Sequence, residues 1–347
     1  MRVAVVTLDT QQSRASNRTA RLDRVTRMLA ANGNDVTVFC NQWWDGSVDT
    51  FEQDDVTYRA LTSNRSIRGF AARLPIALRK VKPDIVHTSY WPPSAAVAAT
   101  TGKLLGSHPV LLDWYGDKPV DANRRMVRSA LSRPSSIVTP SRYASTRVRE
   151  IGTDLDTTVI PASIDIDRIR SIPAAEGPDI VTARHLDEAA NVDMMLLGLA
   201  ELRDRDWQAM VIGDGPARDR FEQKAKELRI ADRVRFVGNI PRDQRIAHYK
   251  AAHVFVQTAE RCMFGVELLW ALASGCAGIV DYQEESAAHE LVEHLDRGFR
   301  TTSSEELSNA IIASADQEER TFNDAFEAYD HEAVFQQYLD VYDELLS

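Results

Sequence analysis

The chain has few cysteines, few lysines and no long apolar run. Its three cysteines, Cys40, Cys262 and Cys276, are odd in number and lack the spacing of a metal site, which argues against a disulfide framework and predicts a reducing cytoplasm. No apolar stretch reaches the ~18 residues of a membrane-spanning helix. The opening Met-Arg-Val-Ala-Val-Val predicts a strand rather than a signal peptide.

Charge is distributed unevenly. There are 7 Lys against 34 Arg and 31 Asp against 20 Glu, a balance typical of a high-salt cytoplasm, as in haloarchaea, although a high-GC genome would also favour arginine. Residues 1–150 contain 22 Lys and Arg against 13 Asp and Glu, whereas residues 151–347 contain 19 against 38. The two halves should therefore meet different partners. The chain is acidic overall and its aromatics are not interleaved with arginines, so we expect no nucleic-acid partner.

The length and the hydrophobic content predict two domains. A chain of 347 residues with 44% hydrophobic residues can form two packed cores. Apolar runs predict strands near 2–8, 35–40, 83–88, 109–113, 135–139 and 157–160, with helices between them, and a second such series starts near 179. This alternation is typical of a doubly wound parallel α/β sheet. The segment 164–179, which holds Pro173, Gly177 and Pro178, is predicted to be the hinge.

Residues 254–292 are the most informative segment. They read as strand, tight loop, helix, Gly275 as a helix stop, strand, loop and helix. Helices that begin at the ends of parallel strands present free N–H groups, which favour a phosphate. Glu267 falls in the first turn of one such helix, and an acid beside a phosphate site suits a nucleotide that carries a hydroxylated sugar.

This segment resembles the donor-site region of family-4 glycosyltransferases of the GT-B fold. Their pattern runs roughly E-G-F-G-x-P-x-x-E-A-M-A-x-G, then a strand, then G-G-x-P-E-V-V, and seven residues match it: Phe264, Gly265, Ala271, Ala273, Gly275, Glu290 and Val292. KPDIVHTS, IVTPSRYASTRVREIG and WQAMVIGDGP resemble other family segments in the same order. The resemblance implies an α/β protein with two Rossmann-like domains facing across a cleft. We expect an acceptor-side domain over 1–165, joined by a C-terminal helix at about 330–347, and a nucleotide-sugar donor domain over 178–325.

The resemblance also implies a donor site in the second domain. Arg184 matches the arginine that pairs with the donor diphosphate. The other predicted donor-binding residues are Gly213, Gly215, Gly238, Asn239, Phe264, Gly265, Glu267 and His289, which stands where a further helix is expected to begin. Structural alternatives remain for several: a simple turn for the glycines, a helix-dipole carboxylate for Glu267 and a packed or surface residue for His289.

The predicted catalytic residues are Glu260, Tyr115 and Asp113. Cys262 and Trp270 stand where the family has its two glutamates, so Glu260 is the acid expected to face the sugar, with a solvent-exposed loop acid as the alternative. Tyr115 replaces the histidine that contacts the donor sugar in relatives, and Asp113 is a polar neighbour. The family's lysine after Arg184 is missing, and the loop 10–17 contains no glycine.

These features predict a retaining hexosyltransferase that uses a nucleotide-sugar donor with neither metal nor cofactor. The alternative is a degenerate, non-catalytic GT-B subunit that binds a sugar nucleotide or a partner transferase. Residues 65–82 mix six Arg or Lys with apolar residues and predict a helix with a break at Pro75. We expect this basic half to attach peripherally to an anionic membrane at the cytoplasmic face and to take a saccharide or lipid-linked saccharide acceptor. The alternative is a helix packed on its own sheet.

Overall fold

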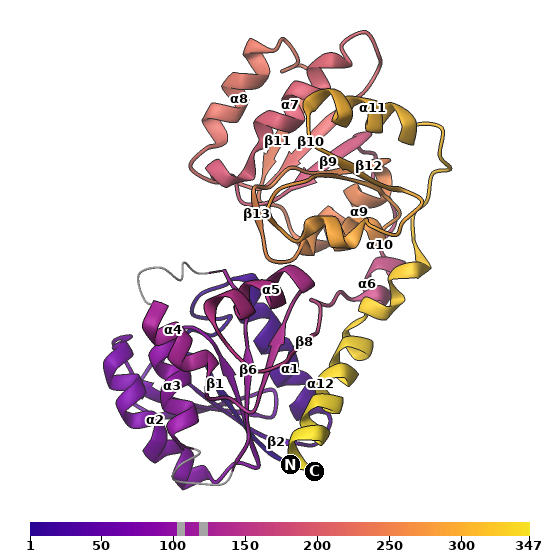
Figure 1. The fold of residues 1–347 in the computed structure, drawn as a ribbon. Helices are drawn as coiled ribbons and strands as arrows, with labels where there is room; N and C mark the ends of the chain where they lie inside the picture. The colour runs from indigo at the N-terminus through magenta and orange to yellow at the C-terminus, as the bar shows by residue number, and fades with distance from the viewer. Residues whose placement is uncertain (103–107, 118–123) are drawn as a thin grey trace. The chain divides into compact units, whose positions relative to one another are not determined.

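The computed structural model describes residues 1–102, 108–117 and 124–347, which form two compact units (Figure 1). Unit 1 comprises Met1–Ala162 and Val334–Ser347, and unit 2 comprises Ser163–Ala333. These limits differ from the sequence boundaries at 165, 178 and 325. The predicted hinge contains helix α6 (Ile166–Ser171), which Asp165 caps and which buries Ile166 and Ile169, so much of this segment is part of unit 2.

Unit 1 is a three-layer α/β unit around an eight-stranded sheet. The strand order is β3-β4-β2-β1-β5-β6-β7-β8, and every pairing is parallel except β3 with β4. The strands are β1 (Arg2–Val6), β2 (Asp35–Asn41), β3 (Thr50–Gln53), β4 (Val56–Thr62), β5 (Ile85–Ser89), β6 (Val110–Asp113), β7 (Ser136–Thr139) and β8 (Thr157–Val159). The helices are α1 (Asn17–Ala31), α2 (Ile67–Val81), α3 (Pro93–Gly102), α4 (Arg124–Leu131) and α5 (Arg142–Ile151).

Helix α2 corrects one prediction. Pro75 lies inside it without ending it, and Phe70, Leu74 and Leu78 face the core together with strand side chains such as Val86. Packing of this apolar face outweighs the local cost of the proline.

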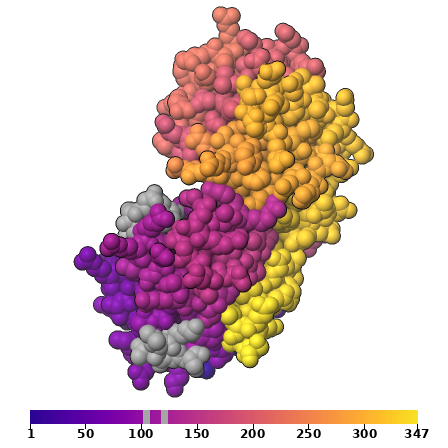
Figure 2. All heavy atoms as spheres, viewed as in Figure 1, coloured from indigo at the N-terminus to yellow at the C-terminus, as the bar shows by residue number. Residues whose placement is uncertain are grey.

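The last helix, α12 (His331–Leu346), belongs to the core of unit 1 from Val334 onward. Phe335, Tyr338 and Tyr342 pack with Val3 and Val36 of the sheet. The space-filling view shows the C-terminal residues, in yellow, lying against the violet surface of this unit (Figure 2).

Unit 2 has a six-stranded parallel sheet of order β11-β10-β9-β12-β14-β16. Its strands are β9 (Ile180–Ala183), β10 (Ala209–Ile212), β11 (Val234–Gly238), β12 (Val254–Gln257), β14 (Ala277–Asp281) and β16 (Gly298–Thr301). The helices are α7 (Val192–Glu201), α8 (Arg218–Glu227), α9 (Arg242–Ala251), α10 (Val266–Ala273) and α11 (Ser304–Ser314), with 3-10 turns η2 (Glu188–Ala190), η3 (Ala288–Leu291) and η4 (Asp324–Tyr329).

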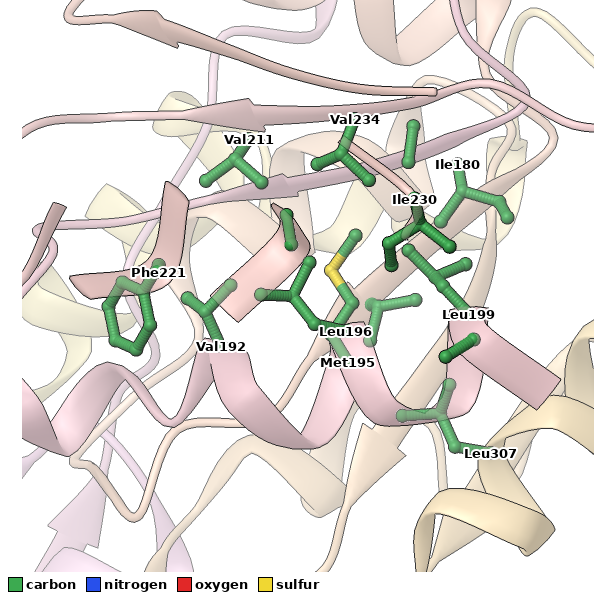
Figure 3. Packing of buried hydrophobic residues seen from close by; sticks show 14 of the residues in the cluster. Ile180, Val192, Met195, Leu196, Leu199, Val211, Phe221, Ile230, Val234 and Leu307 are labelled. Atoms are coloured by element: carbon green, nitrogen blue, oxygen red, sulfur yellow. The ribbon is translucent and has the colours of Figure 1, made fainter. Parts of the chain in front are cut away.

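The central strands of unit 2 are apolar on both faces because helices cover both. In Figure 3, Met195, Leu196 and Leu199 of α7 pack toward the sheet side chains Val211, Val234 and Ile180. Strands buried on both faces are typical of parallel sheets in α/β proteins, so the continuous apolar runs of the sequence dictate this layering.

Candidate donor site

The strand order of unit 2 fixes where a ligand would bind. From β9 the chain proceeds to β10 and β11 on one side, and it returns to β12, β14 and β16 on the other. Open α/β sheets bind ligands outside the carboxyl ends of the strands where this order reverses. The segments that leave β9 and β12 at this point carry Arg184 and Glu260.

Arg184 is mostly buried at this switch point. Its side chain is 19% exposed, and its Nη2 lies 3.9 Å from Asp187 Oδ1. Burial lowers the pKa of the guanidinium, whereas the charges of Cys262, Asp187 and Glu260 act in the opposite direction. The structure therefore brings two predicted residues, Arg184 and Glu260, into one electrostatic neighbourhood. Glu260 is exposed, and its backbone N–H donates to the Ala189 carbonyl at 3.1 Å.

The predicted glycines Gly213 and Gly215 lie directly against the backbone of the segment that carries Arg184. A Cβ on Gly213, whose φ is +127°, would lie 1.8 Å from the Arg184 carbonyl oxygen, and one on Gly215 would lie 2.4 Å from that of Leu186. The Gly213 N–H donates to the Gly238 carbonyl at 2.8 Å. Only glycine permits this crossing of backbones. Their direct contact with a donor stays a prediction.

Two further predicted residues close β11. Gly238 has a φ of +70°, and the side chain of Arg218 lies over it. Asn239 follows and is exposed. Both lie at the carboxyl edge of the sheet, two strands from the switch point.

Phe264 and Gly265 lead into helix α10. Phe264 is buried, with its ring centroid 6.5 Å from that of Tyr329, so it anchors the loop. Gly265 is the N-cap of α10 and has no side chain that could accept a hydrogen bond from the N–H groups of the first turn. The short strands β13 (Arg261–Cys262) and β15 (Glu285–Ser286) pair in parallel and tie this loop to the loop after β14.

Glu267 occupies a different environment from the one predicted. Its carboxylate accepts two hydrogen bonds from Arg242, at 2.8 and 3.0 Å, one from Arg245 at 2.9 Å and one from the Tyr249 hydroxyl at 2.7 Å. Burial alone would raise the pKa of Glu267, but the two arginines and the hydroxyl hold it below its usual value. A carboxylate with four acceptor positions filled cannot also grip ribose hydroxyls as the sequence predicted.

His289 corrects a second expectation. It lies in the four-residue 3-10 turn η3 and not at the start of a longer helix. Its Nδ1 lies 3.0 Å from the Ser286 carbonyl oxygen, and its ring is 5.0 Å from that of Tyr282. The expected row of free N–H groups at the start of a helix is therefore reduced to a single 3-10 turn at this position.

Asp113 of unit 1 has a structural role instead of the predicted catalytic one. It is buried, accepts hydrogen bonds from Arg21 Nε at 2.9 Å and from the Tyr338 hydroxyl at 2.8 Å, and lies 3.7 Å from His87 Nε2. Burial favours the protonated acid, but Arg21 and His87 outweigh it and lower the pKa of Asp113 to about 2. The carboxylate joins β6 to α1 and α12 and is closed to substrate.

Tyr115, two residues further on, is also buried. The nearby Tyr90 hydroxyl donates to Asp117 at 2.8 Å, and Arg18 Nε lies 3.4 Å from the same carboxylate. A small polar hollow opens elsewhere in unit 1, and its cavity volume of about 10 Å³ has room for about one water molecule. Its polar lining comes from Thr7, Asp9, Thr10, Gln11, Thr19, Asp23, Thr26 and Tyr58.

Sequence reasoning missed Arg242, Arg245 and Tyr249 of α9. Two arginines in the first turns of a helix after β11 were a visible signal, but their partner Glu267 is more than twenty residues away. Within the described ranges, no cluster of three His, Cys, Asp or Glu side chains could hold a metal ion. In those same ranges no helix is long and apolar enough to cross a bilayer.

Comparison with known families agrees with this geometry. A model of glycosyltransferase family 4 matches residues 20–168, and a model of group 1 glycosyl transferases matches residues 164–325. The computed structure is similar over 99% of the chain to sucrose-phosphate synthase from Thermosynechococcus elongatus (98% of that chain, TM-score 0.81, 17% identity). It is also similar over 99% of the chain to Anabaena HepE in complex with UDP (all of that chain, TM-score 0.79, 18% identity).

Sequence relatives are named as transferases. The GDP-mannose-dependent alpha-(1-6)-phosphatidylinositol monomannoside mannosyltransferase of Mycobacterium tuberculosis is 25% identical over 86% of this chain and 84% of its own length. The alpha-monoglucosyldiacylglycerol synthase of Streptococcus pneumoniae is 23% identical over 93% and 81%. The protein is therefore a glycosyltransferase of the GT-B type. Within that class it belongs to the family-4-like enzymes, which confirms the predicted fold, family and hexosyltransferase class.

Proposed function

We propose that the protein transfers a hexose from a nucleotide-sugar donor to a saccharide or lipid-linked saccharide acceptor. The observation that carries the proposal is the placement of Arg184 and Glu260 together at the switch point of unit 2. A cation that holds the leaving diphosphate and an acid beside the sugar are what such a transfer requires.

Transfer of the sugar requires mainly electrostatic stabilisation from the protein. Arg184 and the N–H groups at the start of α10 neutralise the departing diphosphate, and Glu260 faces the oxocarbenium-like sugar. In this proposal the arginine and the helix end neutralise the charge that a metal ion would otherwise neutralise. Transfer retains the configuration at the anomeric carbon. Gly213 and Gly215 act by fixing the backbone of Arg184.

The names of the relatives favour this acceptor class. One acts on a phosphatidylinositol monomannoside, and another makes a glucosyldiacylglycerol.

Unit 1 offers a surface suited to an anionic membrane, formed by α2 and α4, with α3 between them. Ile76 and Met126 are 63% and 45% exposed on these two helices. The same helices carry the exposed cations Arg68, Arg73, Arg79, Lys80, Arg124, Arg125 and Arg128. Exposed apolar side chains on basic helices favour the headgroup layer, where each cation contributes on the order of 1 kcal/mol.

Cosedimentation with vesicles tests this attachment. Wild-type protein should pellet with phosphatidylglycerol-containing vesicles and stay in the supernatant with pure phosphatidylcholine, and Ile76→Gln should reduce the pelleted fraction. Leu197→Gln, which changes a 38% exposed leucine on α7 of unit 2, is the matched control and should have no effect. Equal recovery of wild type with both vesicle types would rule out the membrane part of the proposal.

The transferase proposal is tested by a donor screen followed by turnover. UDP, GDP and ADP sugars are screened by thermal shift, and the donor that binds is incubated with saccharide and lipid-linked saccharide acceptors. Product with a retained anomeric configuration is expected, and it should form in the presence of EDTA. Donor binding with no transfer to any acceptor would favour the non-catalytic subunit instead.

A further inference from the structure

The cluster around Glu267 carries more positive charge than it neutralises. Glu267, Arg242 and Arg245 have side chains that are 20%, 27% and 22% exposed, and together they sum to one net positive charge. A cation that is three-quarters buried without its own counter-charge is costly. In the part of the chain that the structure describes, no second acid pairs with either arginine.

The arginines also keep unused donors. Arg242 gives one N–H from each Nη to Glu267 and stacks over Trp270, with 4.8 Å from its guanidinium carbon to the ring centroid. Arg245 gives Nη1 to Glu267 and Nε to the Ile240 carbonyl. Each guanidinium has five N–H groups, so each keeps three without a protein acceptor among the described residues.

The location of the cluster points to a ligand and not to the protein interior. Helix α9 starts after β11 and α10 starts after β12, so Arg242 and Glu267 both lie in first turns at the carboxyl edge of the sheet. Glu267 follows the loop whose Cys262 acts electrostatically on Arg184. The carboxylate thus holds two partly exposed guanidinium groups beside the ligand edge.

We propose that Arg242 and Arg245, oriented by Glu267, bind a phosphate oxyanion of the nucleotide donor and supply the second cationic contact that the chain lacks after Arg184. The inference rests on the proposed function, because it assumes a nucleotide donor at this edge. It assigns Glu267 a positioning role. In place of the predicted carboxylate that accepts hydrogen bonds from ribose, this part of the site has guanidinium groups that donate hydrogen bonds to phosphate.

Calorimetric titration with UDP, GDP and ADP tests the assignment. Arg242→Gln and Arg245→Gln should each weaken binding of the nucleotide that wild type prefers by about tenfold, the size of one charge-assisted bond. Inorganic pyrophosphate should compete with that nucleotide on wild type and compete about tenfold less well on either variant. Arg203→Gln is the matched control, since it removes an exposed cation of unit 2 that does not contact Glu267, and it should leave nucleotide affinity unchanged.

The Glu267→Gln variant separates ligand contact from structural support, because it breaks the same ion pairs but keeps both cations. If the arginines touch phosphate, Glu267→Gln weakens nucleotide binding less than either arginine variant does. If they only hold α10 in place, Glu267→Gln weakens binding as much as they do, and the inference is overturned. It is also overturned if both arginine variants bind the nucleotide as wild type does, or if pyrophosphate competition is unchanged. Failure of wild type to bind UDP, GDP or ADP would instead overturn the proposed function itself.

Discussion

At the scale of single residues, Asp113 is held by its neighbours as a buried carboxylate. Its pKa is lowered to about 2, so its ion pair with Arg21 stabilises the fold above the ordinary carboxyl pKa of ~3.9 and is lost as the pH falls toward 2. This group alone should contribute on the order of 2 kcal/mol to the free energy of unfolding near neutral pH.

Urea unfolding of wild type and Asp113→Asn at several pH values checks this prediction. The stability difference between them should be largest above about pH 4 and should shrink toward pH 2, since wild type then loses the same charge. A difference that stays constant across this range would show that the pair does not titrate as described.

Gly213 is the residue whose replacement should be least tolerated near the site. Alanine there would combine a φ of +127° with a Cβ 1.8 Å from the Arg184 carbonyl oxygen, so Gly213→Ala should destabilise unit 2 by roughly 3 kcal/mol or more. Gly46→Ala is the matched control, because Gly46 has a φ of +98° but no atom within 4 Å, and it should cost only about 1 kcal/mol. Similar thermal shifts for the two variants would contradict the packing argument.

At the scale of elements, most strands could be predicted from the sequence, whereas the contacts between distant residues could not. VFVQ and AGIVD gave β12 and β14 directly, because strands buried on both faces are continuous apolar runs. Three strands of the two large sheets were not predicted: the edge strands β3 and β16, because TFEQ and GFRT are short and mostly polar, and the inner strand β4, because VTYRALT is not a continuous apolar run. Pro75 was taken as a helix break because sequence shows the missing N–H but not the apolar face that packs on the sheet.

The same reasoning explains what could be predicted of the site. Arg184 and Glu260 were found because the strand ends that carry them could be recognised. The environment of Glu267 depends on α9, and that of Asp113 on α12, and no local pattern reveals such pairings. Sequence thus located the ligand edge of unit 2 but could not say which of its polar groups were already engaged within the protein.

Helix α12 is an integral part of the core of unit 1. Phe335 is buried among side chains such as Val3 and Val36, so Phe335→Ala should lower the free energy of unfolding by about 3–5 kcal/mol. Leu346 lies on the same helix but is 42% exposed, and Leu346→Ala should cost well under 1 kcal/mol. Comparable losses in chemical denaturation would mean that α12 is not docked as the structure has it.

At the scale of the whole molecule, each unit provides a different surface. Unit 2 places a cation and an acid at the switch point of a parallel sheet, and unit 1 provides a basic, partly apolar helical face. This division matches the charge difference between the two halves of the sequence. The account depends above all on the donor edge of unit 2, because no sugar can be transferred unless a nucleotide sugar binds there.

The most direct test is calorimetric titration of the nucleotide sugar that wild type binds into wild type, Arg184→Ala and Arg203→Ala. Arg203 is an exposed arginine just after α7 and serves as the matched control. The account predicts one site per chain and a loss of roughly 1.5–3 kcal/mol of binding free energy in Arg184→Ala, as expected for a charge-assisted bond, with no change in Arg203→Ala. Unchanged affinity in Arg184→Ala would contradict the placement of the donor at this switch point.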